Sequence, residues 1–224
     1  MKNIGVNLIF LTHLIVYLQK LKTHIMNKLR QAAFAVAAIF GACALIHLPY
    51  NILTKAHIIS STPAWRTIIA FVGIVICLSE VVFFAYMARS KESSKCVKLP
   101  AIMVMIVPAI SALIRIGNYT SGQCACFAEW WKSGSGFIEV LSPIISIWAV
   151  VWLIVLGFCF RSNKVTMTMS FVAAYESLFS LVLWTFLAGI VTVPPYAYTL
   201  ILVQYYVVWT LFYVALAAHY KKVK

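Results

Sequence analysis

The chain has 224 residues, of which 63% are hydrophobic and only 10% are charged. Soluble domains carry about a quarter charged residues, so this composition excludes a soluble globular protein and indicates a multi-pass membrane protein. The formal charge of +13 does not indicate nucleic-acid binding, because basic residues of membrane proteins gather in their cytoplasmic loops.

The first apolar run covers residues 4–18 and is interrupted by Asn7, Thr12 and His13. As a helix it would span roughly 22 Å, which is less than the ~30 Å of a bilayer's hydrocarbon core. Residues 1–25 have two interpretations. The first is a short extra helix, which would be a seventh span, and the second is sequence upstream of a later start at Met26. The second interpretation is favoured because Lys28 and Arg30 follow Met26. No small-residue cleavage site follows the run, so a cleaved signal peptide is not expected.

Six further apolar stretches predict six membrane-spanning helices, and none shows the alternation that is typical of strands. They cover about residues 32–53, 64–88, 99–117, 137–160, 165–193 and 196–218. The predicted fold is therefore all-α and polytopic.

The basic residues predict the orientation of these helices. One set of connecting segments, with the tail, holds Lys28, Arg30, Arg89, Lys91, Lys95, Lys98, Arg161, Lys164, Lys221, Lys222 and Lys224, whereas the other set holds only Lys55, Arg66 and Lys132. Because positive charge marks the cytoplasmic side, we expect the C-terminus to be cytoplasmic and residues 118–136 to face outward. In a bacterial inner membrane that outer face is oxidising, so closely spaced thiols can be used there.

Residues 118–136 form the longest polar interruption and contain Cys124 and Cys126, one residue apart. A disulfide between residues i and i+2 closes a small ring, and strained disulfides are reduced more easily, which suits an exchanging pair. One alternative is that both cysteines are small apolar residues of an ordinary loop. A second is a soft-metal site completed by His47 or His57.

Glu80 lies inside the second predicted span, on one helix face with Gly73 and Cys77. A carboxyl group within a membrane usually faces the interior of a helix bundle or a water-filled cavity. It is either a proton-handling or ligand-binding group, or a protonated side chain bonded to another helix. The same alternatives hold for Glu176, which neighbouring hydroxyl groups such as that of Ser180 could also satisfy locally.

Arg115 lies one turn from the outer end of the third span, nine residues before Cys124. A nearby guanidinium favours the thiolate over the thiol and would activate one cysteine. Alternatively the side chain extends to the membrane interface, or pairs with Glu139. Cys43, Cys77, Cys96 and Cys159 are expected to be structural.

These features resemble the methylamine-utilisation MauE family, within the DoxX-like group of small membrane proteins. The resemblance covers about residues 31–160 and rests on Glu80, on Arg115 followed by Gly117, and on the sequence Cys124-Ala125-Cys126-Phe127-Ala128, where the family has glycine in place of both alanines. It implies a four-helix unit, to which residues 165–224 add two helices. It also implies a redox role in maturing a partner on the outer face.

The resemblance thus makes Cys124 and Cys126 the expected redox pair, with Arg115 tuning them and Glu80 lining the bundle. The expected partners are the lipid bilayer and a periplasmic thiol or thioredoxin-like protein. No cofactor motif is evident. In particular, no motif in the sequence indicates a quinone site. The alternatives are a small transporter or channel that uses Glu80 and Glu176, with Pro108 and Pro143 interrupting their helices, and a scaffold for another membrane complex.

Overall fold

The structure is a computed structural model that describes residues 3–60, 62–91, 93–122, 129, 132, 134–183 and 195–221, the first 25 of them by their backbone. Every regular element in these ranges is a helix, which confirms the all-α prediction. The helices are α1 (Asn3–Lys55), α2 (Pro63–Arg89), α3 (Lys95–Ser121), α5 (Ser135–Cys159), α6 (Lys164–Leu181) and α7 (Pro195–Lys221).

Four helical stretches in the described ranges are long and apolar enough to cross a membrane, namely Lys28–Lys55, Pro63–Arg89, Lys95–Ser121 and Thr199–Tyr220. Pro143–Cys159 is a shorter apolar helix. The structure is therefore compatible with a multi-pass membrane protein, but it does not confirm the predicted count of six spans. The fifth predicted span, 165–193, is described only to residue 183, where the α-helix has already ended at Leu181.

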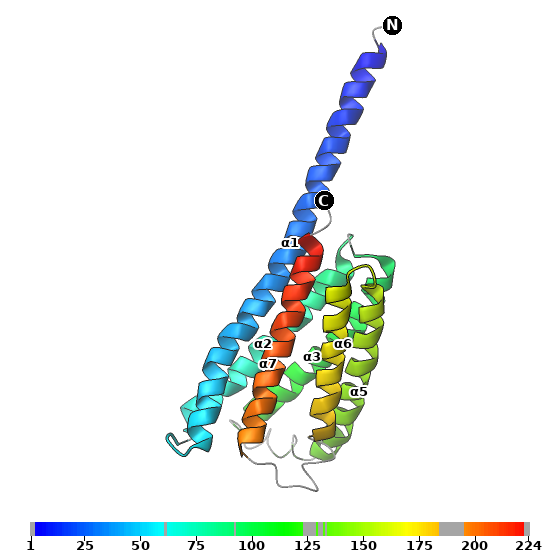
Figure 1. The fold of residues 1–224 in the computed structure, drawn as a ribbon. Coiled ribbons are helices and arrows are strands. Elements are labelled where there is room, and N and C mark those ends of the chain that lie inside the picture. The colour runs from blue at the N-terminus through cyan, green and yellow to red at the C-terminus, as the bar shows by residue number, and fades with distance from the viewer. Residues whose placement is uncertain are drawn as a thin grey trace.

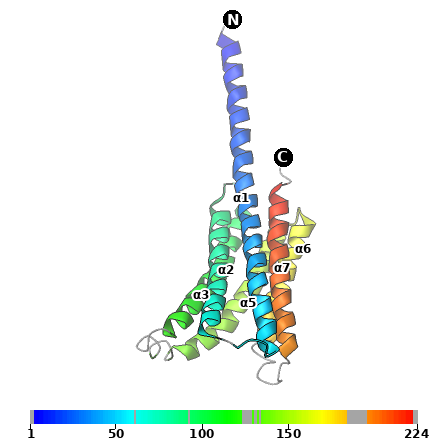
Figure 2. The ribbon, with the colours of Figure 1, turned by 90° about the vertical axis from the view of Figure 1, so that its left-hand side faces the viewer.

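The first helix differs from the prediction of a separate N-terminal helix. Residues 3–55 form one continuous helix about 80 Å long, and its first half projects beyond the other helices (Figures 1 and 2). Residues 6–40 contain neither glycine nor proline, so nothing in that stretch favours a turn. A seventh span that folds back on the first is not present.

The six helices form a closed ring in which each packs against the next along the chain and α7 packs against α1. The second half of α1 lies beside α7 (Figure 1). The helices predicted as a four-helix unit therefore form one side of the ring, and α6 and α7 close it.

The ring has two different ends. We call the end that carries the connections 90–94 and 160–163 the terminal end, because α7 also finishes there, and the opposite end the far end (Figure 1). The structure places Lys28, Arg30, Arg89, Lys91, Lys95, Lys98, Arg161 and Lys164 at the terminal end, and Lys55 and Arg66 at the far end.

Local signals set the helix boundaries at these ends. The Thr62 hydroxyl accepts a hydrogen bond from the Trp65 N–H, with Pro63 in the first turn of α2. The Asn163 side chain caps α6 in the same way. At the other end of α2, the Ser93 hydroxyl donates to the Met87 carbonyl over 2.6 Å, which satisfies one of the free carbonyls of a helix C-terminus.

The terminal half of the ring is a dry core. Its fully buried side chains include Phe83, Phe84, Met87, Leu153, Leu156, Phe160, Phe212, Tyr213 and Leu216. Tyr220, in the last turn of α7, is also buried there, with 6% of its surface exposed. The outward faces carry exposed apolar side chains such as Leu45, Val82, Leu113 and Phe158, and an apolar surface on this scale suits lipid contact.

Candidate functional site

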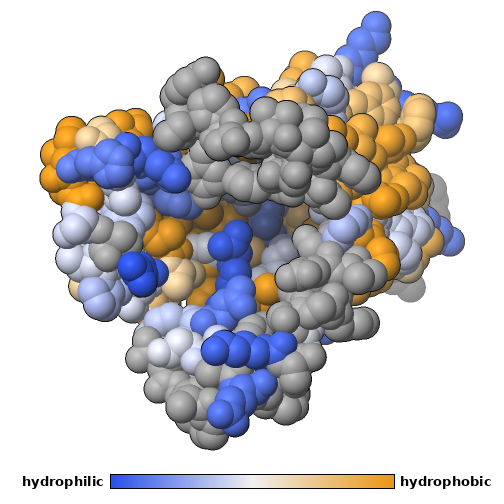
Figure 3. Space-filling model, turned by 90° about the horizontal axis from the view of Figure 1, so that it is seen from below, coloured by the Kyte–Doolittle hydropathy of each residue, from blue (hydrophilic) through white to orange (hydrophobic). Residues whose placement is uncertain are grey.

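A polar chamber occupies the far half of the ring, where the dry core stops. Two adjoining cavities of about 370 and 230 Å³ share Cys77, Arg115, Ser180 and Tyr205, and all six helices contribute to their walls. A third cavity of about 440 Å³ lies between the start of α2 and the end of α3 and shares Arg115 with the other two. Seen from the far end, the molecule is hollowed near its centre, with hydrophilic atoms in the hollow (Figure 3). Arg115 therefore lies at the point where the outer cavity meets the two inner cavities.

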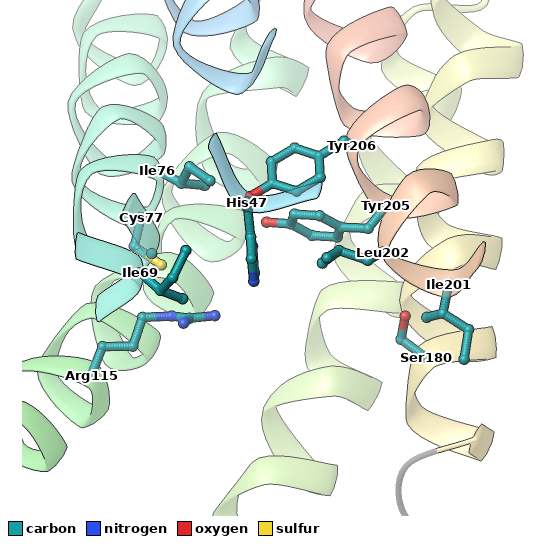
Figure 4. A pocket seen from close by; sticks show the side chains of 11 residues that line it. His47, Ile69, Ile76, Cys77, Arg115, Ser180, Ile201, Leu202, Tyr205 and Tyr206 are labelled. Atoms are coloured by element: carbon teal, nitrogen blue, oxygen red, sulfur yellow. The ribbon is translucent and has the colours of Figure 1, made fainter. Parts of the chain in front are cut away.

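The Arg115 side chain crosses from α3 to α2 instead of extending outward along its own helix (Figure 4). Gly73 makes room for it, since a Cβ built there would lie 2.5 Å from Nη1 and 2.9 Å from Cζ of the guanidinium. The guanidinium also lies beside the Cys77 thiol, which lines the same two inner cavities. The side chain is exposed to the chamber, and within the described residues no carboxylate forms an ion pair with it. The thiol it contacts is thus Cys77, which was expected to have only a structural role.

Glu80 lies deeper in the chamber, on the α2 face that also presents Gly73 and Cys77. This confirms the common face predicted from their spacing. The carboxyl group is 7% exposed and accepts a 3.1 Å hydrogen bond from the Tyr213 hydroxyl of α7. The Glu80 carboxyl group therefore has features of both alternatives: it is hydrogen-bonded to another helix, and it also lines a cavity.

Glu176 is the second buried carboxyl group of the same cavity. It is 2% exposed and accepts hydrogen bonds from the Ser180 hydroxyl at 2.7 Å and from the Trp209 indole N–H at 3.0 Å. The predicted local partner Ser180 is confirmed, and Trp209 adds a bond from α6 to α7. Both carboxyl groups accept from neutral donors, so neither takes part in a described ion pair.

The sequence did not indicate the contribution of α7 to this site. Tyr205 and Tyr206 line the wall opposite Arg115, and the Tyr206 hydroxyl lies 3.0 Å from Nδ1 of His47 on α1. The Tyr205 hydroxyl and the His47 ring both point into the chamber (Figure 4). Aromatic residues at helical spacing resemble any packed membrane helix, so their place could be found only once α7 was seen against α1.

Pro108 and Pro143 do not interrupt their helices, contrary to the prediction. Both α3 and α5 continue through them. Membrane helices tolerate proline when neighbours satisfy the freed backbone groups. Pro108 lines the inner cavity together with Val104, whose carbonyl is the one that loses its helical hydrogen bond to a proline at position 108.

Cys124, Cys126 and Phe127 lie outside the described residues, as does the side chain of Glu139. Of the alternative metal ligands, His47 lines the chamber, whereas His57 is exposed in the turn after α1 with a φ of 57°. His47 and His57 are ten positions apart, which corresponds to roughly 15 Å along a helix. Within the described ranges, no three His, Cys, Asp or Glu side chains are grouped as metal ligands.

A second feature absent from the predictions is a thiol pair at the terminal end. Cys96 at the start of α3 and Cys159 at the end of α5 lie beside one another: the Cys159 thiol donates to the Cys96 carbonyl over 2.9 Å and is also within hydrogen-bonding reach of the Cys96 thiol. Cys96 Sγ is 2.9 Å from the Ser94 hydroxyl. Because 63 residues separate the two cysteines, their spacing carries no signal.

Comparison of the chain with protein-family models, with curated proteins and with solved structures found no match. The chemistry of the site therefore has to be inferred from its own geometry. That geometry is a water-accessible guanidinium, two buried carboxyl groups with neutral donors, and an aromatic wall, inside an apolar ring.

Proposed function

We propose that this is a redox-associated protein of the bacterial inner membrane that exchanges disulfides with a thiol partner on the outer face. Cys124 and Cys126 are the exchanging pair, as the resemblance to the methylamine-utilisation MauE family implies. The concentration of basic residues at the terminal end supports a cytoplasmic terminal end and an outer far end.

The observation that carries the proposal is the course of α3. This helix brings Arg115 into the chamber and ends at Ser121, three residues before Cys124. The last turn of α3 also lines the outer cavity through Asn118, Tyr119 and Gly122. The proposed thiol pair therefore follows directly on a helix end that opens into a polar chamber.

Exchange proceeds through a mixed disulfide. A thiolate of the reduced partner attacks one sulfur of the Cys124–Cys126 disulfide, and the other sulfur leaves as a thiolate and takes up a proton. The partner's second thiolate then attacks the mixed disulfide, which leaves the partner oxidised and both cysteines reduced. A cationic group nearby stabilises the leaving thiolate, and Arg115, which lines all three cavities on the same helix that leads to Cys124, is proposed for this role.

Single-cysteine trapping tests this function. Exchange is reversible, so in Cys126→Ala the Cys124 thiolate attacks the disulfide of an oxidised partner and releases one partner thiolate. Without Cys126 to attack the resulting mixed disulfide, that species should accumulate with a periplasmic protein and disappear on reduction. Cys124→Ala tests the reverse order, and Cys43→Ala is the control for loss of an unrelated thiol. If neither variant traps a partner and the double variant supports normal growth and partner maturation, the redox proposal is wrong.

A second candidate function, a proton-coupled transporter, is favoured by one observation. Glu80 and Glu176 come from different helices, α2 and α6, yet face the same cavity, as carboxyl groups on a substrate or proton path do. In that case Glu80→Gln abolishes uptake of the substrate by cells, while Cys124→Ser/Cys126→Ser retains it. The opposite pattern, with partner maturation lost in the double cysteine variant, supports the redox function.

A further inference from the structure

We propose that the chamber is a binding site for a small organic anion with an apolar body, such as an aromatic or aliphatic monocarboxylate, whose charged group pairs with Arg115. This inference uses the chamber alone and does not depend on the thiol pair.

The first step is the charge of Arg115. The guanidinium is exposed to a chamber among apolar helices, and an anion that binds there gains charge-assisted hydrogen bonds, which are stronger than those between neutral groups. Among the described residues no carboxylate forms an ion pair with it, and the hydrogen bonds of the two chamber carboxyl groups go elsewhere: Glu80 bonds to Tyr213, and Glu176 to Ser180 and Trp209. The guanidinium lies against Gly73 and faces open space. An anion from outside would satisfy it.

The second step is the geometry of the polar groups around that space. Arg115 points across the chamber towards Tyr205 and His47, which come from α7 and α1 (Figure 4). The Tyr205 hydroxyl makes no hydrogen bond among the described side chains, whereas its neighbour Tyr206 is bonded to His47. A carboxylate accepts two parallel bonds from a guanidinium and retains lone pairs for further donors. Arg115 and the Tyr205 hydroxyl are suitably placed donors for one such group.

The third step is the rest of the wall, which sets the class of the ligand. Ile69, Ile76, Ile201 and Leu202 line the same cavity, and its volume of about 370 Å³ lies within the range of small-molecule sites. An inorganic anion would leave most of this apolar surface unmatched. An anion with an apolar or aromatic body would cover it.

Equilibrium binding to the purified, detergent-solubilised chain tests the proposal, with radiolabelled benzoate, phenylacetate and hexanoate as probes. The double variant Cys124→Ser/Cys126→Ser is the background, so failure of the redox function cannot affect the result. We expect at least one probe to bind, and its uncharged counterpart of the same shape (benzyl alcohol for benzoate) to bind tenfold or more weakly. Inorganic phosphate should not compete.

Three variants place the anion at Arg115. Arg115→Gln should weaken binding of the carboxylate tenfold to a hundredfold, as expected on the loss of a charged bidentate donor, and leave the weak binding of the uncharged counterpart unchanged. Gly73→Ala keeps the charge but displaces the guanidinium, so it should also weaken binding several-fold. The matched controls are Gly41→Ala, where a Cβ meets nothing within 4 Å, and Arg89→Gln, which removes the same charge at the terminal end.

A bilayer can supply the same chemistry as a free acid, namely an anionic group on an apolar body. Repeating the measurement in phosphatidylcholine and phosphatidylglycerol nanodiscs separates the two sources. Equal binding in both assigns a free acid, and suppression by phosphatidylglycerol assigns a lipid headgroup. Failure of all three carboxylates, equal binding of charged and uncharged probes, or full binding by Arg115→Gln and Gly73→Ala would overturn the proposal. If Arg115→Gln does not fold, Gly73→Ala alone decides.

Discussion

The absence of a side chain at Gly73 of α2 is what lets the Arg115 side chain of α3 enter the chamber. A Cβ at position 73 would lie 2.5 Å from Nη1 of Arg115, closer than carbon and nitrogen can approach. Small residues commonly allow membrane helices to pack closely. Here the space left by the glycine is occupied by a charged group from the neighbouring helix, so the helix contact and the site share one position.

Three helical glycines should differ in their tolerance of alanine. Gly73→Ala meets the flexible end of Arg115, which can move, so we expect a loss of about 1 kcal/mol or less, at the low end of the cost of overpacking. Gly157→Ala meets the Phe171 ring at 2.7 Å, and overpacking of this kind costs about 1–3 kcal/mol. Gly41→Ala meets nothing within 4 Å and should be neutral or slightly stabilising. Thermal unfolding in detergent measures all three, and an equal loss at positions 73 and 157 would contradict this ranking.

The bond from Tyr213 to Glu80 should contribute measurably to stability. Tyr213→Phe removes the hydroxyl that donates to the buried carboxyl group, and leaving a buried acceptor unsatisfied costs about 1–3 kcal/mol. The matched control is Tyr175→Phe, because Tyr175 is 62% exposed, and its effect should stay within about 0.5 kcal/mol. Chemical or thermal unfolding compares the two variants. Equal effects would show that the bond from Tyr213 to Glu80 does not contribute to stability.

The bond from Trp209 to Glu176 should show the asymmetry of buried hydrogen bonds. Trp209→Phe leaves one carboxyl oxygen of Glu176 without its donor, so it should destabilise the protein by about 1–3 kcal/mol. Replacing both partners, as in Trp209→Phe/Glu176→Met, removes the unsatisfied group as well as the bond. We therefore expect the double variant to lose less stability than the sum of the single variants, measured as a double-mutant cycle. Simple additivity would show that the two side chains are not coupled.

The Cys96 and Cys159 thiols should react together with a bifunctional reagent. Dibromobimane, which becomes fluorescent when it bridges two nearby thiols, should label the purified Cys124→Ser/Cys126→Ser chain, which lacks the other closely spaced thiols, and join α3 to α5. Cys96→Ser and Cys159→Ser should each lose the signal. Cys43→Ser, which removes a buried thiol elsewhere, should retain it. Fluorescence that survives either of the first two substitutions would place the reactive pair elsewhere.

Local sequence patterns determined the helices and one face of the site. The apolar stretches are long enough to predict helices in a membrane, and the cap at Thr62 and the proline after it start α2 where expected. Gly73, Cys77 and Glu80 were predicted to share a face, because helical periodicity depends only on spacing along one helix. The structure places all three on the chamber wall.

Tertiary packing decided the rest, because it joins residues whose separation in sequence carries no pattern. Nothing in the sequence around Arg115 indicated that its side chain packs against Gly73 of the neighbouring helix, where the chamber opens. Tyr213 reaches Glu80 across 133 residues, and Cys96 meets Cys159 across 63. Such contacts form when α7 packs against α1 and closes the ring. That closure depends on how the six described helices pack together, and the sequence of a single helix does not reveal it.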